Sequence, residues 1–535
     1  MKVMGRQCAK VTLALCIVVN LWGQTASQTA SNSRSDKETD SDTTLRTTTR
    51  TVVLDVVVSD QNGRPLDGLK RSDFAVKEDN QEQAVVTFED HGPAAKDPDR
   101  SASAQNIILI DEVNTRLTDA AFTRHCLHKL VEKYGTKLEH PTSLLVLTGQ
   151  GIRVLQPATR DGSALLASLD RHNPTMPTDL LLVGAEHDSR RIFLSLAAMH
   201  KIAMAGIGSN VRRNLIWVGS GFPLVSGSVM TSQSRDSLFN TIRNISMELL
   251  QARTTVYTID PSGVAAVVYP VNSFERATAR DGSPAETLPM SPSPGFGSSL
   301  QAQMERGGFD MPDVVLQSLA LETGGRSFAG RNDLEAEINA SRTEADHFYT
   351  LSYSPANHNF DGKFRTISVR VNRPGVTART RAGYFALPDP PEMTQEVLTA
   401  TLEEALANPL QYTGIHFSAS GEVVPGPSKT WQVLLKIDPQ NVNFKPQSDG
   451  TRLSTLVTAT AAFSDGPVPV AIKNHGFSVN IPQRASAPSP GPPLIVKYEM
   501  PVSDNVTRLK VVVRDEVTGA MGTAEIVPKM PRANP

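Results

Sequence analysis

Cysteine is scarce in this sequence: three occur among 535 residues, and two of them, Cys8 and Cys16, lie close to the start. The first residues have the order of a secretory signal peptide, with basic residues, an apolar run at 11–22 and then small and polar residues. We therefore expect residues 1–26 to be removed. Cys126 then remains alone, which excludes an internal disulfide. The sequence predicts an exported chain, secreted or periplasmic, that is stabilised by core burial.

The chain also lacks an excess of charge of one sign and any second long apolar run. Its formal net charge is -2 and no long run of Lys and Arg occurs, so the electrostatic signature of a nucleic-acid-binding protein is missing. After signal cleavage no stretch reaches the roughly 20 apolar residues that cross a bilayer, so we predict no transmembrane segment. Aromatic residues make up 5%, which predicts cores of Val, Leu, Ile and Ala.

The length is enough for several domains, and changes in composition suggest where they begin and end. A β-branched run at 52–58 stops at a dense turn signal, whereas residues 262–311 are rich in Ser, Pro and Gly. We predict a disordered linker at 27–47, a small β domain at 48–92, a linker at 93–104, an α/β domain at 105–386 with a mobile insertion at 262–311, a hinge and helix at 387–410, and a β-sandwich at 411–530.

The central region predicts an α/β fold. Strand-like apolar runs at 106–110, 143–148, 215–218 and 255–259 alternate with helical periods, and these runs lack polar alternation. Strands of this kind form a mostly parallel, doubly wound sheet that is covered on both faces. A β-hairpin is predicted at its C-terminal end, where the strand candidates 365–371 and 376–381 flank a turn at 372–375.

Several motifs occur in a fixed order along this region. They lie at 60–69 with 73–74, at 110–115, at 256–260, at 322–326, and at 349–355 with 361–363 and 381–384. Together they resemble the von Willebrand factor A-related (VWFA-related) proteins abundant in Acidobacteria, over most of residues 50–386. The resemblance implies a von Willebrand factor type A (vWA) or Rossmann-like central domain, and relatives elsewhere bind proteins or matrix.

Many vWA domains hold Mg²⁺ at the carboxyl ends of the sheet strands, through an Asp-x-Ser-x-Ser motif, a Thr and a further Asp. In this sequence the first motif reads Asp111, Val113 and Thr115, so an isopropyl group replaces one hydroxyl ligand. Thr178 resembles the second-loop hydroxyl, and no carboxylate stands after the strand that ends at Val218. The resemblance therefore implies a degenerate metal-ion-dependent adhesion site at Asp111, Thr115 and Thr178, with Mg²⁺ as the possible cofactor. Asn114, Glu112 or Ser220 could substitute as oxygen donors, so metal binding stays open.

The same loops supply candidate residues for contact with a partner. Asn114, Ser220 and Asp260 carry polar side chains beside the predicted strand ends, where open α/β sheets bind ligands. The alternative is structural, since Asp and Thr commonly bond to backbone donors in turns. Both interpretations stay open for Asp111, Thr115 and Asp260.

Three further patterns are weak as catalytic or metal sites. His125 and His128 lie off the helical stripe that carries Cys126, so the three side chains do not converge. The segment 219–221 lacks the first glycine of a nucleophile elbow, and the glycines at 206 and 208 follow a helix, which is the wrong context for a dinucleotide loop.

These patterns favour an exported, non-catalytic binding or adhesion-type protein, whose partner is a protein or a cell-surface polymer. Two alternatives stay open: a metal-dependent exported hydrolase, and a structural envelope protein without a specific ligand.

Overall fold

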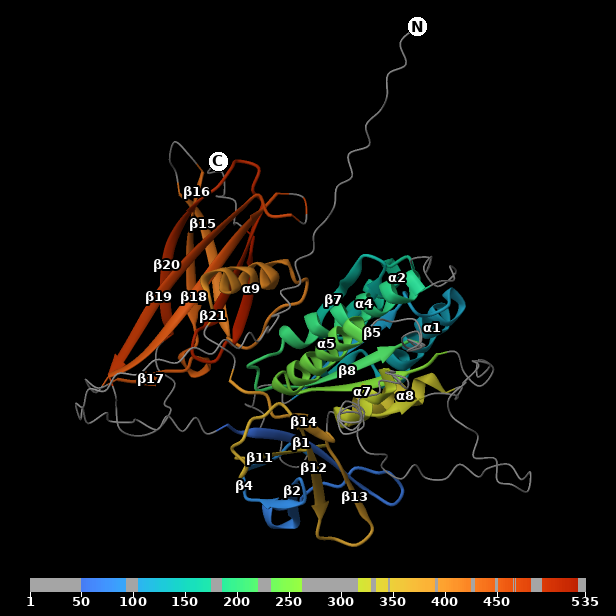
Figure 1. Cartoon of the computed structure of the whole chain (residues 1–535). Helices are drawn as coiled ribbons and strands as arrows, with labels where there is room; N and C mark the ends of the chain where they lie inside the picture. The colour runs from blue at the N-terminus through green and yellow to red at the C-terminus, as the bar shows by residue number, and fades with distance from the viewer. Residues whose placement is uncertain are drawn as a thin grey trace, which may run out of the picture.

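The computed structural model describes much of the chain after its predicted leader (Figure 1). The described residues are 50–92, 104–174, 185–219, 232–261, 316–328, 333–344, 347–389, 393–424, 429–447, 451–482 except 465 and 467, and 493–527. The predicted signal peptide, the linker at 27–47 and the insertion at 262–311 lie outside this set. None of the helices in the described part has the length and apolar character needed to cross a membrane.

A sheet of six strands forms the centre, in the order β10-β9-β8-β5-β6-β7. The strands are β5 (Ala104–Asp111), β6 (Lys137–Thr148), β7 (Gly151–Asp161), β8 (Arg212–Val218), β9 (Thr254–Ile259) and β10 (Ser327–Phe328). Neighbouring strands are parallel except for the antiparallel pair β6 and β7. The chain winds outward from β5 through β6 on one side and through β8 on the other, so the predicted mostly parallel α/β sheet is confirmed.

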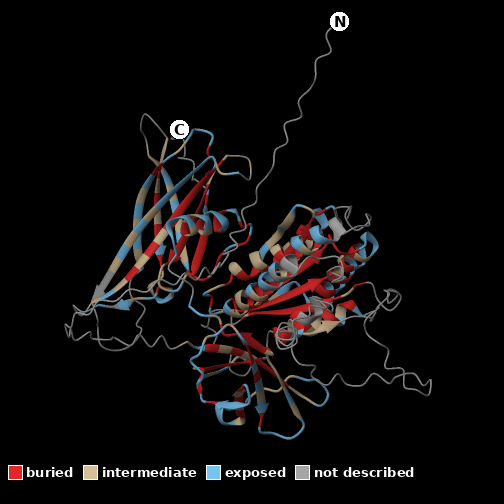
Figure 2. Cartoon of the chain, viewed as in Figure 1, coloured by how far each residue is buried: buried red, intermediate tan, exposed pale blue. Residues whose placement is uncertain are grey.

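Helices cover both faces of this sheet, which explains the uninterrupted apolar runs of its strands (Figure 2). Every residue of β8 and β9 is buried. One face packs against α1 (Leu117–Tyr134), α2 (Gly162–Arg171) and α8 (Leu334–Thr343). The other packs against α4 (Ala185–Met204), α5 (Ser232–Gln251) and α7 (Leu316–Glu322).

A second unit combines strands from both sides of the central sheet in sequence. One of its sheets has the order β13-β1-β11-β4 and the other β14-β12-β2-β3. The strands are β1 (Val52–Asp60), β2 (Phe74–Glu78), β3 (Gln81–Gln83), β4 (Val85–Asp90), β11 (Tyr349–Tyr353), β12 (Phe364–Val371), β13 (Val376–Arg379) and β14 (Gly383–Phe385). The segment 48–92 is thus not a β domain by itself, because its strands pair with strands beyond residue 348.

The predicted C-terminal hairpin is not formed. β12 pairs with β2 and β14, whereas β13 pairs with β1 in the other sheet. The turn signal itself is real, since Gly375 has a φ of 74°. The turn carries the chain from one layer to the other, however, because each strand finds its partner in the segment 52–78.

A buried charged group ties the two sheets of this unit together. Glu78 of β2 accepts hydrogen bonds from Arg365 at 3.0 Å, from the Tyr353 hydroxyl at 2.7 Å and from the Tyr384 hydroxyl at 3.0 Å. Arg365 also donates to the carbonyl oxygens of Asn357 and Asn359, both at 2.7 Å. A buried ion pair of this kind offsets its desolvation cost only when further hydrogen bonds satisfy both partners, as they do here.

The C-terminal part contains two antiparallel sheets around one apolar core. The first has the order β15-β16-β20, from β15 (Phe417–Val424), β16 (Thr430–Ile437) and β20 (Leu494–Pro501). The second comprises β17 (Lys445–Pro446), β18 (Thr451–Phe463), β19 (Ala471–Pro482), β21 (Arg508–Asp515) and β22 (Met521–Ile526). Trp431, Leu456 and Leu509 are completely buried between them.

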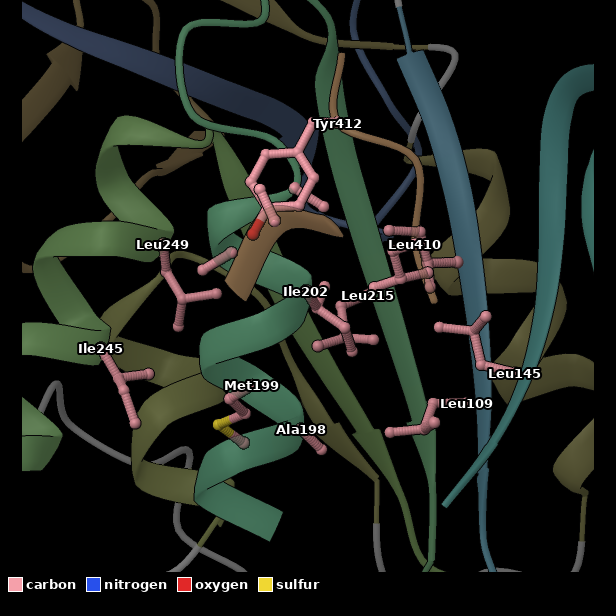
Figure 3. Packing of buried hydrophobic residues seen from close by; sticks show 14 of the residues in the cluster. Leu109, Leu145, Ala198, Met199, Ile202, Leu215, Ile245, Leu249, Leu410 and Tyr412 are labelled. Carbon is pink, nitrogen blue, oxygen red and sulfur yellow. The ribbon is translucent and has the colours of Figure 1, made fainter. Parts of the chain in front are cut away.

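Helix α9 (Gln395–Ala407) joins this part to the centre through a shared hydrophobic cluster. Leu402 and Leu406 of α9 belong to the same cluster as Ile202 of α4 and Ala461 of β18. Figure 3 shows the segment that follows α9, with Leu410 and Tyr412 beside Ile202 and Leu215. The C-terminal sheets and the central sheet are therefore parts of one packed body.

His200 adds a charged contact to this junction. Its Nδ1 lies 2.7 Å from Oε2 of Glu248 in α5, and its Nε2 lies 3.0 Å from Oε1 of Glu404 in α9. Burial lowers the pKa of His200, but the hydrogen bonds and charges of the two carboxylates outweigh burial and raise it to about 10. The protonated imidazole of His200 thus connects α4 to both α5 and α9.

We predict that His200→Gln destabilises the chain by about 1–3 kcal/mol at pH below 6.5, because glutamine removes two charge-assisted hydrogen bonds. A raised folded-state pKa gives stability that is fully present below the ordinary value of 6.5 and is lost as the pH rises towards about 10. Urea unfolding of both chains across this range measures the difference.

The matched control is His128→Gln, which removes a more exposed pair with Asp170 and has a small effect. A difference between His200→Gln and the parent chain that stays constant up to pH 10 would contradict the assignment.

Candidate functional site

The carboxyl ends of β5, β8 and β9 meet at one edge of the central sheet. We call residues 111–115, Gly219 and Asp260 the crest, because they lie at the end of these three strands or directly follow it. The winding direction of the sheet reverses between β5 and β8, and open α/β sheets bind their ligands beside such a switch point. A binding site of this fold is therefore expected at the crest.

Asp111 is completely buried, and both of its carboxylate oxygens are occupied by N–H donors. Oδ1 accepts from the backbone N–H groups of Val113 and Asn114, both at 2.9 Å. Oδ2 accepts from Asn114 Nδ2 at 2.8 Å and from the indole Nε1 of Trp217 at 3.0 Å. A carboxylate has about four lone-pair positions, so none is left for a cation.

The pKa of Asp111 reflects this enclosed position. Burial raises it, and the hydrogen bonds from Asn114, Trp217 and Val113 lower it without outweighing burial. The donors hold the side chain in one orientation, and the loop 111–115 is fixed with it.

The other two positions of the first metal motif do not fit Mg²⁺ either. Val113 is buried in the hydrophobic cluster on the α4 side of the sheet, so this position is part of the core. Thr115 is buried as well. Mg²⁺ requires six oxygen ligands in near-octahedral array, and the side chains described at this motif do not offer them.

Gly219 occupies the place where a further carboxylate would stand. A Cβ atom added to Gly219 would lie 2.6 Å from Asp111 Cβ and 3.0 Å from Thr115 Oγ1. Both distances are shorter than normal contacts, so no side chain fits here without moving the loop. The described residues of the crest therefore do not fit a Mg²⁺ site based on Asp111 and Thr115.

The predicted rim residues have different surroundings. Asn114 is buried and donates to Asp111 and, at 3.0 Å, to Ser195 of α4, so it supports the loop. Asp260 is half-exposed, and its backbone N–H donates to Phe328 at 2.9 Å. Thr178 and Ser220 lie outside the described residues. Asp260 is thus the described rim candidate that is half-exposed, whereas Asn114 is buried.

A buried pair that no local sequence pattern predicts, Glu112 with His172, lies directly beside the crest. Glu112 Oε1 lies 2.6 Å from His172 Nε2, and His172 Nδ1 contacts the Arg153 guanidinium. Arginine can only donate, so Nδ1 accepts and the hydrogen on Nε2 points to Glu112. Glu112 and His172 are 60 positions apart in sequence, and no local pattern connects them.

This group links β5, α2 and β7 below the crest. Both nitrogens of His172 have protein partners, and its side chain is 1% exposed. An imidazole held in this way is not available to take a proton from a substrate. Its role in the structure is to fix the position of the loop that follows β5.

The cysteine and histidines of α1 remain apart, in agreement with their positions on the predicted helix. Cys126 is buried in the core on the α1 side of the sheet, whereas His128 is paired with Asp170 at 2.8 Å. Over the ranges given above, the structure contains no group of three or more His, Cys, Asp or Glu side chains that could hold a metal ion.

Comparison with known proteins yields only distant likenesses. No protein-family model and no curated protein matches the sequence. The chain is similar to the VWA domain of SpRpn10, with 16% identity over 29% of this chain and 74% of that chain and a TM-score of 0.17. It is also similar to three N-terminal domains of the type V pili tip protein Mfa5 from Porphyromonas gingivalis, with 11% identity over 87% of this chain and 79% of that chain and a TM-score of 0.16. At these TM-scores neither likeness carries an argument, and the vWA-like interpretation of the centre depends on its strand order.

We predict that Asp111→Asn destabilises the chain by about 1–3 kcal/mol. The carboxamide has a single acceptor oxygen, so a buried donor from Trp217 or Asn114 loses its partner. Urea unfolding measures the loss. Asp170→Asn, at an exposed carboxylate, is the control and changes little. Equal stability of Asp111→Asn and the parent chain would show that these hydrogen bonds do not hold the loop.

We predict that Mg²⁺ leaves the thermal unfolding midpoint of the chain unchanged. A ligand that binds the folded state alone raises this midpoint, and Asp111 has no lone pair to offer. Calorimetry in millimolar MgCl₂ and in EDTA makes the comparison. A saturable increase with Mg²⁺ that disappears in Asp111→Asn would contradict the prediction.

Proposed function

We propose that the chain is an exported, non-catalytic binding protein of the VWFA-related type, whose crest contacts a protein or a cell-surface polymer. The observation that carries the proposal is the hydrogen bonding of Asp111. Four internal donors fix the loop at the switch point of the sheet, which leaves the carboxylate of Asp111 engaged within the protein. Rigid loops on a rigid scaffold favour binding, because little conformational freedom is lost on contact.

The surrounding groups support binding more than catalysis. Asp111 and His172 are two titratable side chains beside the switch point. Both have all of their hydrogen-bonding positions filled by the protein. The half-exposed carboxylate of Asp260 lies at the same edge and is suited to a cationic or hydrogen-bond-donating group of a partner.

The proposed location follows from the sequence. The order of residues at the N-terminus is typical of a secretory leader, and a mature chain with Cys126 alone needs no disulfide to fold. We propose a secreted or periplasmic location and a partner at the cell envelope, with recognition that does not require a metal ion.

Affinity capture tests this function. We expect the immobilised mature chain to retain a defined set of envelope components, equally with and without EDTA. Asp260→Arg reverses the charge at the crest and should abolish this retention. Lys497→Glu reverses an exposed charge on β20 and is the matched control, which should retain the same set. Identical capture by Asp260→Arg, or turnover of ester, peptide or glycoside substrates by the purified chain, would contradict the proposal.

A further inference from the structure

A groove opens at the edge of the two-sheet unit, whose strands β1–β4 come before the central sheet in sequence and whose strands β11–β14 come after it. It encloses about 820 Å³ and is lined by η1 (Arg71–Asp73), by β2 and by the junction of β3 and β4. Here β3 ends one sheet and β4 ends the other, so the two layers separate along this side. In Figure 1 the labels β2 and β4 mark this side of the unit.

Three apolar residues contribute to the lining of the groove. Phe74, Val76 and Val85 line it and are largely buried, at 7%, 2% and 8% exposure. They belong to the hydrophobic core of the unit, so this part of the lining is fixed by packing. An apolar lining of this kind is suited to contact with an aliphatic side chain.

The walls of the groove carry an excess of positive charge. Lys70, Arg71 and Arg370 line it together with a single acidic residue, Glu82. Within the described ranges, Lys70 and Arg370 are exposed and make no ion pair. The Arg71 guanidinium donates to the carbonyl oxygen of Val85, at the start of the edge strand β4. Two cations are thus available to a ligand.

We propose that this groove binds an acidic, extended peptide segment of a partner protein. The carboxylates of the segment pair with Lys70 and Arg370, and a neighbouring aliphatic side chain packs against the apolar part of the lining at Phe74 and Val85. An extended backbone fits beside open strand edges, because the unpaired peptide groups of such edges accept another strand. The apolar part of the lining and the size of the groove distinguish this ligand from a small inorganic anion.

The site is separate from the crest, so it can be tested independently of the function proposed above. The probe is a fluorescein-labelled peptide of alternating Glu and Val, about ten residues long, with the Gln–Val peptide as its uncharged counterpart. Fluorescence anisotropy with the full mature chain measures binding. We expect saturable binding of the acidic peptide alone, and weaker binding as the salt concentration rises.

We expect the double variant Lys70→Glu/Arg370→Glu to weaken peptide binding by about ten-fold or more. Lys497→Glu, an equal charge reversal on β20, should leave binding within about two-fold, and so should the crest variant Asp260→Arg. Circular dichroism checks that each variant is folded. If the double reversal does not fold, Lys70→Gln and Arg370→Gln are measured singly, and each should weaken binding.

Three outcomes would overturn the proposal. The first is the absence of saturable binding by the acidic peptide. The second is equal binding by the Gln–Val peptide or by the groove variants. The third is that the chain binds a sulfated polysaccharide but not the acidic peptide, and that the groove variants lose this binding. The groove would then recognise an anionic polymer and not a peptide.

Discussion

The apolar faces of the central sheet have to be covered, and the arrangement of the whole chain depends on how this is achieved. On one face the cover extends from α4 and α5 to α9 and on to β18 of the C-terminal part, all within one cluster. Each aliphatic side chain buried there contributes about 1.5–3 kcal/mol. Because the C-terminal sheets share this core, they are held in place by packing, and His200 adds a directional contact that apolar surfaces lack.

Local periodicity predicted the central sheet well but could not identify strand partners elsewhere. The apolar run at 106–110 became β5, with both of its faces buried as expected for a parallel sheet. Periodicity of this kind shows which side chains are buried, not which strand lies alongside. The pairing of Val52 with Tyr353 joins residues just over 300 positions apart, and nothing near either residue encodes it. The same limitation explains why 372–375 looked like a hairpin turn.

Residues of the motifs described above have structural roles. Tyr353 of one sheet donates to Glu78 of the other and so joins the two layers, whereas Tyr384 donates to Glu78 within the same sheet. A Cβ atom on Gly325 would lie 1.8 Å from the carbonyl oxygen of Val256, and only glycine permits this approach. The sequence placed Asp111 at the crest correctly. It could not show the donor from Trp217, which is 106 positions away and becomes a neighbour only when β8 pairs with β5.

The Trp217 indole and the Asn114 carboxamide give Asp111 what a cation would give a carboxylate in a metal site, namely positive charge density directed at both oxygens. The two solutions exclude one another, because a cation at Asp111 would have to displace donors that are buried. A crest built this way keeps its shape whatever ions surround the protein. Under the functions proposed above, selectivity for a partner would come from side chains that reach the surface, such as Asp260 at the crest and Lys70 in the groove, and not from an open coordination position.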